Sequence, residues 1–101
     1  MELADILGIL REHAEELRER FSVKRIAVFG SYAKGSFNDA SDVDVYVEFD
    51  LSSVTYDKYI ELISYLESLL GKKVDLITKE GLRSIRISDI RDDIVKHLVY
   101  V

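Results

Sequence analysis

The chain has 101 residues, of which 48% are hydrophobic and 33% charged, and it contains no cysteine. This length fits a single domain over residues 1–101. The lack of cysteine excludes disulfides and thiolate sites, and no apolar run approaches the ~20 residues that span a bilayer. The net charge of −5 argues against direct nucleic-acid binding, because phosphate contacts need clustered cations.

The N-terminus is acidic and lacks the basic region of a secretion signal, so we expect no membrane association and a cytoplasmic location. An acidic domain can still bind a nucleotide where a metal ion supplies the positive charge.

The hydrophobic pattern of the first half predicts one helix and two strands. Residues 3–20 carry apolar side chains at three- and four-residue steps, which predicts an amphipathic helix. A short apolar run over residues 25–29 ends at Gly30 and is typical of a buried strand. Residues 30–38 are rich in turn formers. Residues 42–49 alternate between apolar and polar side chains, which predicts a second strand with two distinct faces.

The second half predicts helix, strand and helix. Residues 55–70 again show helical spacing, and Gly71 suits the position after the helix end. Three hydroxyl residues could cap the start of this helix: Ser52, Ser53 and Thr55. Residues 73–78 favour a third strand, and Ser88 could cap a last helix. The predicted fold class is therefore α/β (α+β in some schemes), with a small mixed sheet of about three or more strands and helices packed on it.

Two features near the C-terminus leave alternatives open. The apolar residues 98–101 could form a seam between two copies of the chain in a homodimer, pack internally, or pack against another protein. Arg83, Arg86 and Arg91 follow the third strand. A solvated loop is the default interpretation of these arginines, and a basic patch for a triphosphate or an acidic partner is the alternative.

A glycine-rich segment, Gly30-Ser31-Tyr32-Ala33-Lys34-Gly35, directly follows the first predicted strand. Glycine at a strand end allows a sharp turn and the close approach of a ligand. A helical turn beginning there would offer free N–H groups to a phosphate, and the Ser31 hydroxyl could add a hydrogen bond. Taken alone, however, such a short motif favours a solvated loop with two turn glycines.

Three aspartates form the second candidate group. Asp42 and Asp44 share one strand face with Cα atoms ~6.5–7 Å apart. Their carboxylates could reach one metal ion or bridge two ions ~3.5–4 Å apart, and oxygen ligands suit magnesium. Asp75 could join them if its strand lies beside the second, at a cost in repulsion unless cations hold the group. The alternative for Asp75 is an edge position paired with a lysine: Lys72, Lys73 or Lys79.

Together these motifs resemble the minimal nucleotidyltransferases of the polymerase-beta-like superfamily. The family signature is Gly-Ser, ten residues, then Asp-x-Asp, and Gly30-Ser31 with Asp42 and Asp44 match it at that spacing. Asp75 stands where the family has its third carboxylate. The resemblance extends over nearly the whole chain, and it implies the nucleotidyltransferase fold.

The resemblance implies transfer of AMP, or another nucleoside monophosphate, from a nucleoside triphosphate, most often ATP, to a hydroxyl. It implies that Asp42, Asp44 and Asp75 are the catalytic residues and the ligands of two Mg²⁺ ions, and that Asp75 could accept the hydroxyl proton. Gly30 and Ser31 would hold the β- and γ-phosphates.

Lys34 is the position where this chain departs from the family pattern. Many relatives carry arginine there. Lysine keeps the positive charge but lacks the planar fork that contacts a phosphate through two donors. We therefore expect Lys34 in the nucleotide-binding set, with its role left open.

Relatives of this size resemble antitoxins that act beside a helical HEPN-type ribonuclease toxin. The resemblance implies that a tyrosine of this toxin accepts AMP, which agrees with the acidic charge of the chain. The alternative is a catalytically inactive binding module that neutralises the toxin by contact alone. Six tyrosines would suit an interface, although packing in a small core accounts better for most of them. Retention of all the family's carboxylates argues against the inactive module.

Overall fold

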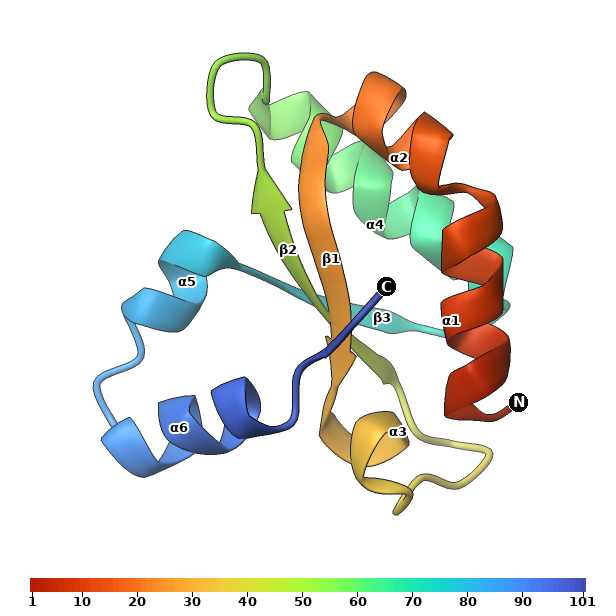
Figure 1. Ribbon diagram of the computed structural model, residues 1–101, viewed down its shortest axis with the longest axis vertical. Coiled ribbons are helices and arrows are strands. Elements are labelled where there is room, and N and C mark those ends of the chain that lie inside the picture. The colour runs from red at the N-terminus through yellow and green to blue at the C-terminus, as the bar shows by residue number, and fades with distance from the viewer.

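The computed structural model describes residues 1–101 as six helices and one four-stranded sheet (Figure 1). The strands are β1 (Val23–Phe29), β2 (Val43–Phe49), β3 (Val74–Thr78) and β4 (Val99–Tyr100). The helices are α1 (Leu3–Glu12), α2 (Ala14–Phe21), α3 (Gly30–Lys34), α4 (Tyr56–Leu70), α5 (Lys79–Arg83) and α6 (Ser88–Lys96). None of the helices has the length and hydropathy needed to cross a membrane.

The sheet is mixed, with the strand order β3-β2-β1-β4. β1 pairs antiparallel with both β2 and β4, whereas β2 and β3 run parallel and are joined through α4. The register of β2 places Asp44 opposite Phe29 on one side and opposite Asp75 on the other. The predicted fold class is confirmed.

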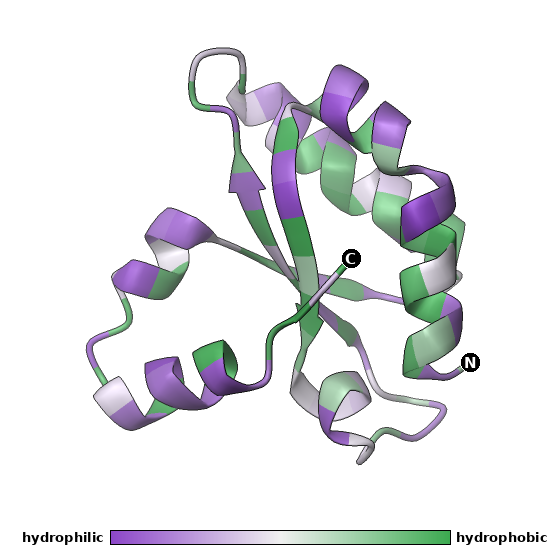
Figure 2. Ribbon diagram, in the orientation of Figure 1, coloured by the Kyte–Doolittle hydropathy of each residue, from purple (hydrophilic) through white to green (hydrophobic).

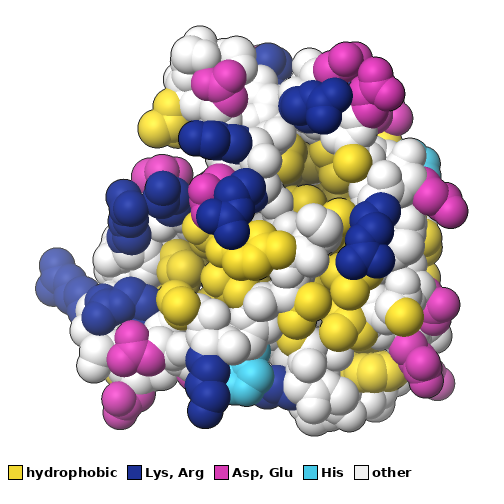
Figure 3. Space-filling view, viewed as in Figure 1, with side chains coloured by type: hydrophobic (Ala, Val, Ile, Leu, Met, Phe, Trp, Pro, Cys, Tyr) yellow, Lys and Arg dark blue, Asp and Glu magenta, His cyan; other side chains and the backbone are white.

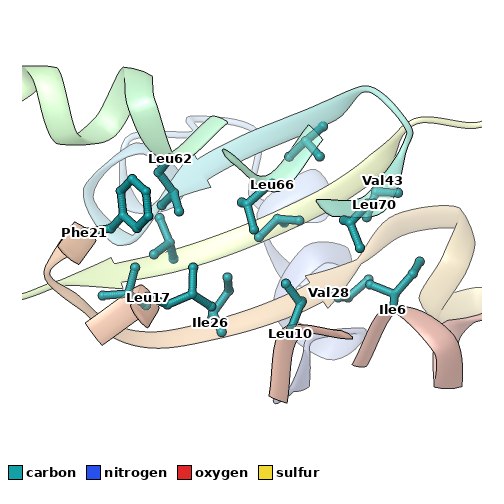
Figure 4. Packing of buried hydrophobic residues seen from close by; sticks show 14 of the residues in the cluster. Ile6, Leu10, Leu17, Phe21, Ile26, Val28, Val43, Leu62, Leu66 and Leu70 are labelled. Carbon is teal, nitrogen blue, oxygen red and sulfur yellow. The ribbon is translucent and has the colours of Figure 1, made fainter. Parts of the chain in front are cut away.

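One face of the sheet packs against α1, α2 and α4 and forms the main core. The valines of β2 that share this face, Val43, Val45 and Val47, are all fully buried. Figure 4 shows Leu10 and Leu17 from the N-terminal helices and Leu62 and Leu66 from α4 among the side chains that fill this layer. The hydrophobic bands of these helices turn toward the strands in Figure 2. This core holds the central strands β1 and β2 firmly in place.

The opposite face of the sheet carries Asp44 and is only partly covered. Tyr46, two residues along β2 from Asp44, is buried with Ala27 and with Leu82 of α5. Ile94 of α6 packs against the same small cluster. The predicted alternation along β2 is confirmed, but its second face is not simply solvated. The Tyr46 hydroxyl donates to the Glu48 carboxylate at 2.8 Å beneath this cover.

The single helix predicted over residues 3–20 is wrong, because the chain breaks between α1 and α2 at His13. The backbone of His13 leaves the helical region at φ −108° and ψ 14°, and its Nδ1 lies 2.8 Å from the Ile9 carbonyl oxygen. Both helices bury their apolar side chains in the same core. The apolar spacing therefore continues across the break and gives no sign of it.

The remaining boundaries follow local chemistry. Thr55 caps α4 by accepting a hydrogen bond from the Lys58 N–H, and Gly71 ends that helix at φ +66°, both as predicted. The Ser88 cap is wrong, because Ile87 precedes the first turn of α6 and Ser88 is already helical. The short elements α5 and β4 were not predicted. Residues 98–101 pack internally, because β4 pairs with β1.

Candidate active site

Gly30 makes the first close contact of the site. β1 ends at Phe29, and Gly30 turns the chain into α3 with φ +70°. A Cβ at this position would fall on the Asp44 Oδ2 atom and lie 2.9 Å from the Asp44 Cγ. The sharp turn predicted from the sequence is confirmed, and the group that approaches the glycine here is the Asp44 carboxylate. Approach by a ligand stays a prediction.

Asp44 and Asp75 are brought together by the parallel pairing of β2 and β3. Burial, and after it the neighbouring charges of Asp75 and Asp42, together raise the pKa of Asp44 to about 6. Asp75 itself is exposed on the edge strand, and none of the structure's ion pairs joins it to a lysine. The structure therefore does not show the alternative arrangement, in which Asp75 forms an ion pair with a lysine at the edge of the sheet.

Asp42 lies at the rim of this pair. It is exposed and directly precedes β2, close enough for its charge to act on Asp44. The structure gathers no three His, Cys, Asp or Glu side chains in an arrangement that could hold a metal ion. The three aspartates therefore lie at the same end of the sheet without forming such a group in this structure, and their role as a metal-ligand set stays a prediction.

The donor chemistry of the pair still fits a divalent cation. Two carboxylates face each other across neighbouring strands, and burial together with the neighbouring carboxylates makes the more buried one hold its proton more tightly than usual. Carboxylate oxygens are the ligands that magnesium prefers. Asp44 and Asp75 could therefore hold Mg²⁺, with Asp42 available at the rim.

The segment that follows Gly30 is anchored by aromatic packing. Tyr32 is buried and stacks on Phe37, with ring centroids 4.4 Å apart and planes 11° from parallel. Gly35 ends α3 in the left-handed region, and the Ser36 N–H donates to the Ser31 carbonyl at 2.9 Å. Ser31 is half-buried in the first turn of α3. The glycine-rich segment is thus a short helix held against the body of the protein, where a solvated loop was the default expectation.

Lys34, at the end of α3, contacts a residue that the sequence did not single out. Its Nζ lies 2.7 Å from the Asp93 Oδ2 on α6. Asp93 also has the His97 Nδ1 atom 3.4 Å from its other oxygen. The two partners are 59 residues apart, so no local spacing could have indicated the pair.

The carboxylate pair opens onto the molecular surface. The largest cavity, about 600 Å³, lies at the opposite end of the sheet, where β1 begins and β2 ends, and contains none of the three aspartates. On the face shown in Figure 3, basic side chains gather over α5 and the loop that follows it, and acidic ones lie over α1 and α2. Arg83 and Arg86 are exposed there, whereas Arg91 donates to the Ile85 carbonyl at 3.0 Å. An open site suits a large acceptor.

Most of the tyrosine side chains pack in or against the hydrophobic core, as expected. Tyr32 and Tyr46 are buried, and Tyr59 and Tyr65 are half-buried against the main core. Only two tyrosines are exposed, Tyr56 and Tyr100.

Comparison with known proteins adds a family match. Residues 10–101 match the family model described as Nucleotidyltransferase domain. Protein adenylyltransferase MntA of Thermococcus cleftensis is 46% identical to this chain over 100 residues, which cover 98% of this chain and 95% of the relative.

Solved structures show the same fold. A structure assigned as a minimal nucleotidyltransferase superposes with a TM-score of 0.72 at 30% identity, covering 98% of this chain and 95% of the other. A crystal structure of a toxin–antitoxin with AMP-PNP superposes with a TM-score of 0.61 at 26% identity, covering 96% of this chain and 69% of the other.

Proposed function

This chain belongs to the nucleotidyltransferase domain family and is a nucleotidyltransferase, and on this premise we propose that it moves AMP from ATP to a tyrosine hydroxyl of a HEPN-type toxin and thereby acts as its antitoxin. The observation that carries the proposal is the contact of Gly30 with the Asp44 carboxylate, beside Asp75 on the next strand. This arrangement places a short glycine-led helix, suited to phosphate, directly against metal-binding carboxylates.

Asp42, Asp44 and Asp75 are proposed to hold two Mg²⁺ ions. When bound, the ions lower the pKa of the attacking hydroxyl and neutralise the departing pyrophosphate. Asp44 supplies the fixed ligand, since it is held between Gly30 and Asp75. Asp42 is the exposed ligand that would complete the set on binding.

The other residues are proposed to orient the triphosphate and take the proton. The Gly30 N–H and the Ser31 hydroxyl hold the β- and γ-phosphates, which leaves the α-phosphorus open to attack. The acceptor oxygen forms a bond to that phosphorus as the bond to pyrophosphate breaks. Asp75, exposed beside the attacking group, accepts the proton that the hydroxyl loses.

Three observations support a protein acceptor and a toxin partner. Asp42 and Asp75 are exposed, so a side chain of another protein can reach the site. A relative with nearly the same span is a protein adenylyltransferase. A structural neighbour is part of a toxin–antitoxin and was solved with an ATP analogue.

The experiment that tests the proposal separates enzyme from binding module. The double variant Asp42→Asn/Asp44→Asn removes two carboxylates. The matched control is Asp39→Asn, because Asp39 is an exposed aspartate in the loop that leads to Asp42. We expect the double variant to bind the toxin but to lose its neutralisation in a growth assay, while the control retains both. Neutralisation by the double variant at wild-type level would favour the inactive binding module.

A further inference from the structure

The ion pair between Lys34 and Asp93 joins the two elements that border the carboxylate site. Lys34 is the last residue of α3, and Asp93 lies in the middle of α6. The ammonium and the carboxylate are 2.7 Å apart. Figure 1 shows α6 lying beside α3 at the lower end of the sheet.

Both partners lie on the side of the sheet that carries Asp44. α6 packs through Ile94 against Tyr46, which follows Asp44 by two residues on β2 and therefore shares its face. Lys34 lies four residues after Gly30, the residue that touches the Asp44 carboxylate, so it is one helical turn away on the same side of α3. The ion pair therefore borders the site where the triphosphate is proposed to lie.

The chemistry of the pair leaves Lys34 able to bind a further anion. An ammonium carries three N–H donors, and Asp93 accepts the one hydrogen bond that the structure gives this group. The side chains of Lys34 and Asp93 are 37% and 51% exposed, so a ligand can reach them. The Lys34 ammonium lowers the pKa of Asp93, which keeps the carboxylate charged at neutral pH.

We propose that Asp93 is a positioning residue for nucleotide binding: it fixes the Lys34 ammonium at the border of the Asp44–Asp75 site, where the remaining donors bind a phosphate of the triphosphate. This inference rests on the proposed function. A free lysine side chain loses much rotamer freedom when it binds, and a side chain already held in place loses less. Asp93 thus restrains a flexible lysine side chain, which has no rigid planar fork of its own.

The test measures binding of a Mg²⁺ complex of an ATP analogue with a non-hydrolysable α–β bridge by calorimetry. Asp93→Asn keeps the side-chain shape and removes its charge. Asp92→Asn is the matched control, because Asp92 is the exposed neighbour on the same helix and forms none of the structure's ion pairs. We expect Asp93→Asn to weaken binding roughly two- to fivefold, and Asp92→Asn to leave it unchanged.

A double-mutant cycle separates positioning from a structural role. In a Lys34→Ala background, Asp93→Asn should have no further effect on binding, since the group it positions is gone. In the transfer reaction, Asp93→Asn should raise the KM for ATP and leave kcat within about twofold. Circular dichroism confirms that each variant is folded.

Three results would overturn the inference. Asp93→Asn could bind the analogue as tightly as Asp92→Asn, or it could weaken binding equally in the Lys34→Ala background, which would mean that Asp93 acts through α6 rather than through Lys34. A folded wild-type protein that binds no nucleotide would overturn the proposed function, and the inference with it.

Discussion

Gly30 is the residue on which the carboxylate pair depends most directly. Its φ of +70° disfavours any other residue, and the Asp44 carboxylate occupies the space that a side chain would need. Asp44 is short and rooted in a central strand, so it has little freedom to move aside. Glycine at position 30 therefore allows both the turn of the backbone into α3 and the close approach of α3 to the Asp44 carboxylate.

Replacing Gly30 with alanine should therefore destabilise the protein by about 3 kcal/mol, from backbone strain and from overpacking together. Gly35→Ala is the matched control, because Gly35 has φ +77° but no atom within 4 Å of an added Cβ, and only strain of about 1 kcal/mol applies. The measurement is urea unfolding followed by circular dichroism. The double variant Gly30→Ala/Asp44→Ala should recover the part due to overpacking. Equal losses at Gly30 and Gly35 would contradict the account.

Asp44 should make the metal-free protein less stable as the pH rises. Its pKa in the folded state is about 6 against an ordinary 3.8, so the folded state binds the proton more tightly than the unfolded state does. The stabilisation is complete below about pH 4, is lost as the pH rises through about 6, and levels off about one pH unit above that. Solvent screening of this partly exposed group limits the effect to about 1 kcal/mol.

Asp44→Asn removes this dependence, and the unfolding free energy of the variant should exceed that of the wild type near pH 7.5. The measurement is urea unfolding in EDTA from pH 4 to 8, read as the difference between variant and wild type. A difference that does not change between pH 4 and 7 would show that the Asp44 carboxyl is not perturbed.

The sequence predicted which segments meet better than it predicted their contacts. The spacing of Gly30-Ser31 and Asp42-Val43-Asp44 is local, and it identified two segments that the structure brings together, although the Gly30–Asp44 contact itself was not predicted. The exposed position of Asp42 just before β2, at the rim of the pair, was not predicted, because the sequence placed Asp42 inside the strand. The contact of Asp93 with Lys34 depends on how α6 packs, and the two residues are 59 positions apart in the sequence.

At the scale of elements, the helices differ in how firmly they are held. α4 buries Leu62, Leu66 and Leu70 in the main core, whereas α6 has no buried residue. α6 is held by the partial burial of Ile94, by the Arg91–Ile85 hydrogen bond and by the Lys34–Asp93 pair. The element that borders the site is therefore the more weakly attached one.

Amide hydrogen exchange should show this difference. Amides of α6 should exchange through a local opening well below the global unfolding free energy, while those of the central turns of α4 exchange near it. The measurement is exchange followed by NMR, with the two helices of one sample as mutual controls. Equal protection in α4 and α6 would contradict the expectation.

Element prediction succeeded where burial is strong and periodic. The alternation of residues 42–49 and the spacing of residues 55–70 gave β2 and α4 nearly to their ends. The break at His13 was missed because both helices face the same core. The elements α5 and β4 are too short to show a period, and β4 exists only because β1 offers it an edge.

For the whole molecule, the site lies at one end of the sheet and opens outward. The main core lies behind the sheet, under α1, α2 and α4, and leaves the Asp44 face to two small helices. This arrangement fits an enzyme whose acceptor is another protein, because an open site leaves room for one to dock.

The most direct test of this account is transfer of label from ATP labelled at the α-phosphate, with Mg²⁺, to the HEPN-type toxin partner. We expect label on a toxin tyrosine, located by mass spectrometry, with wild type and Asp39→Asn, and none with Asp42→Asn/Asp44→Asn. A stable complex of the toxin with both wild type and double variant, with no label transferred by either, would contradict it.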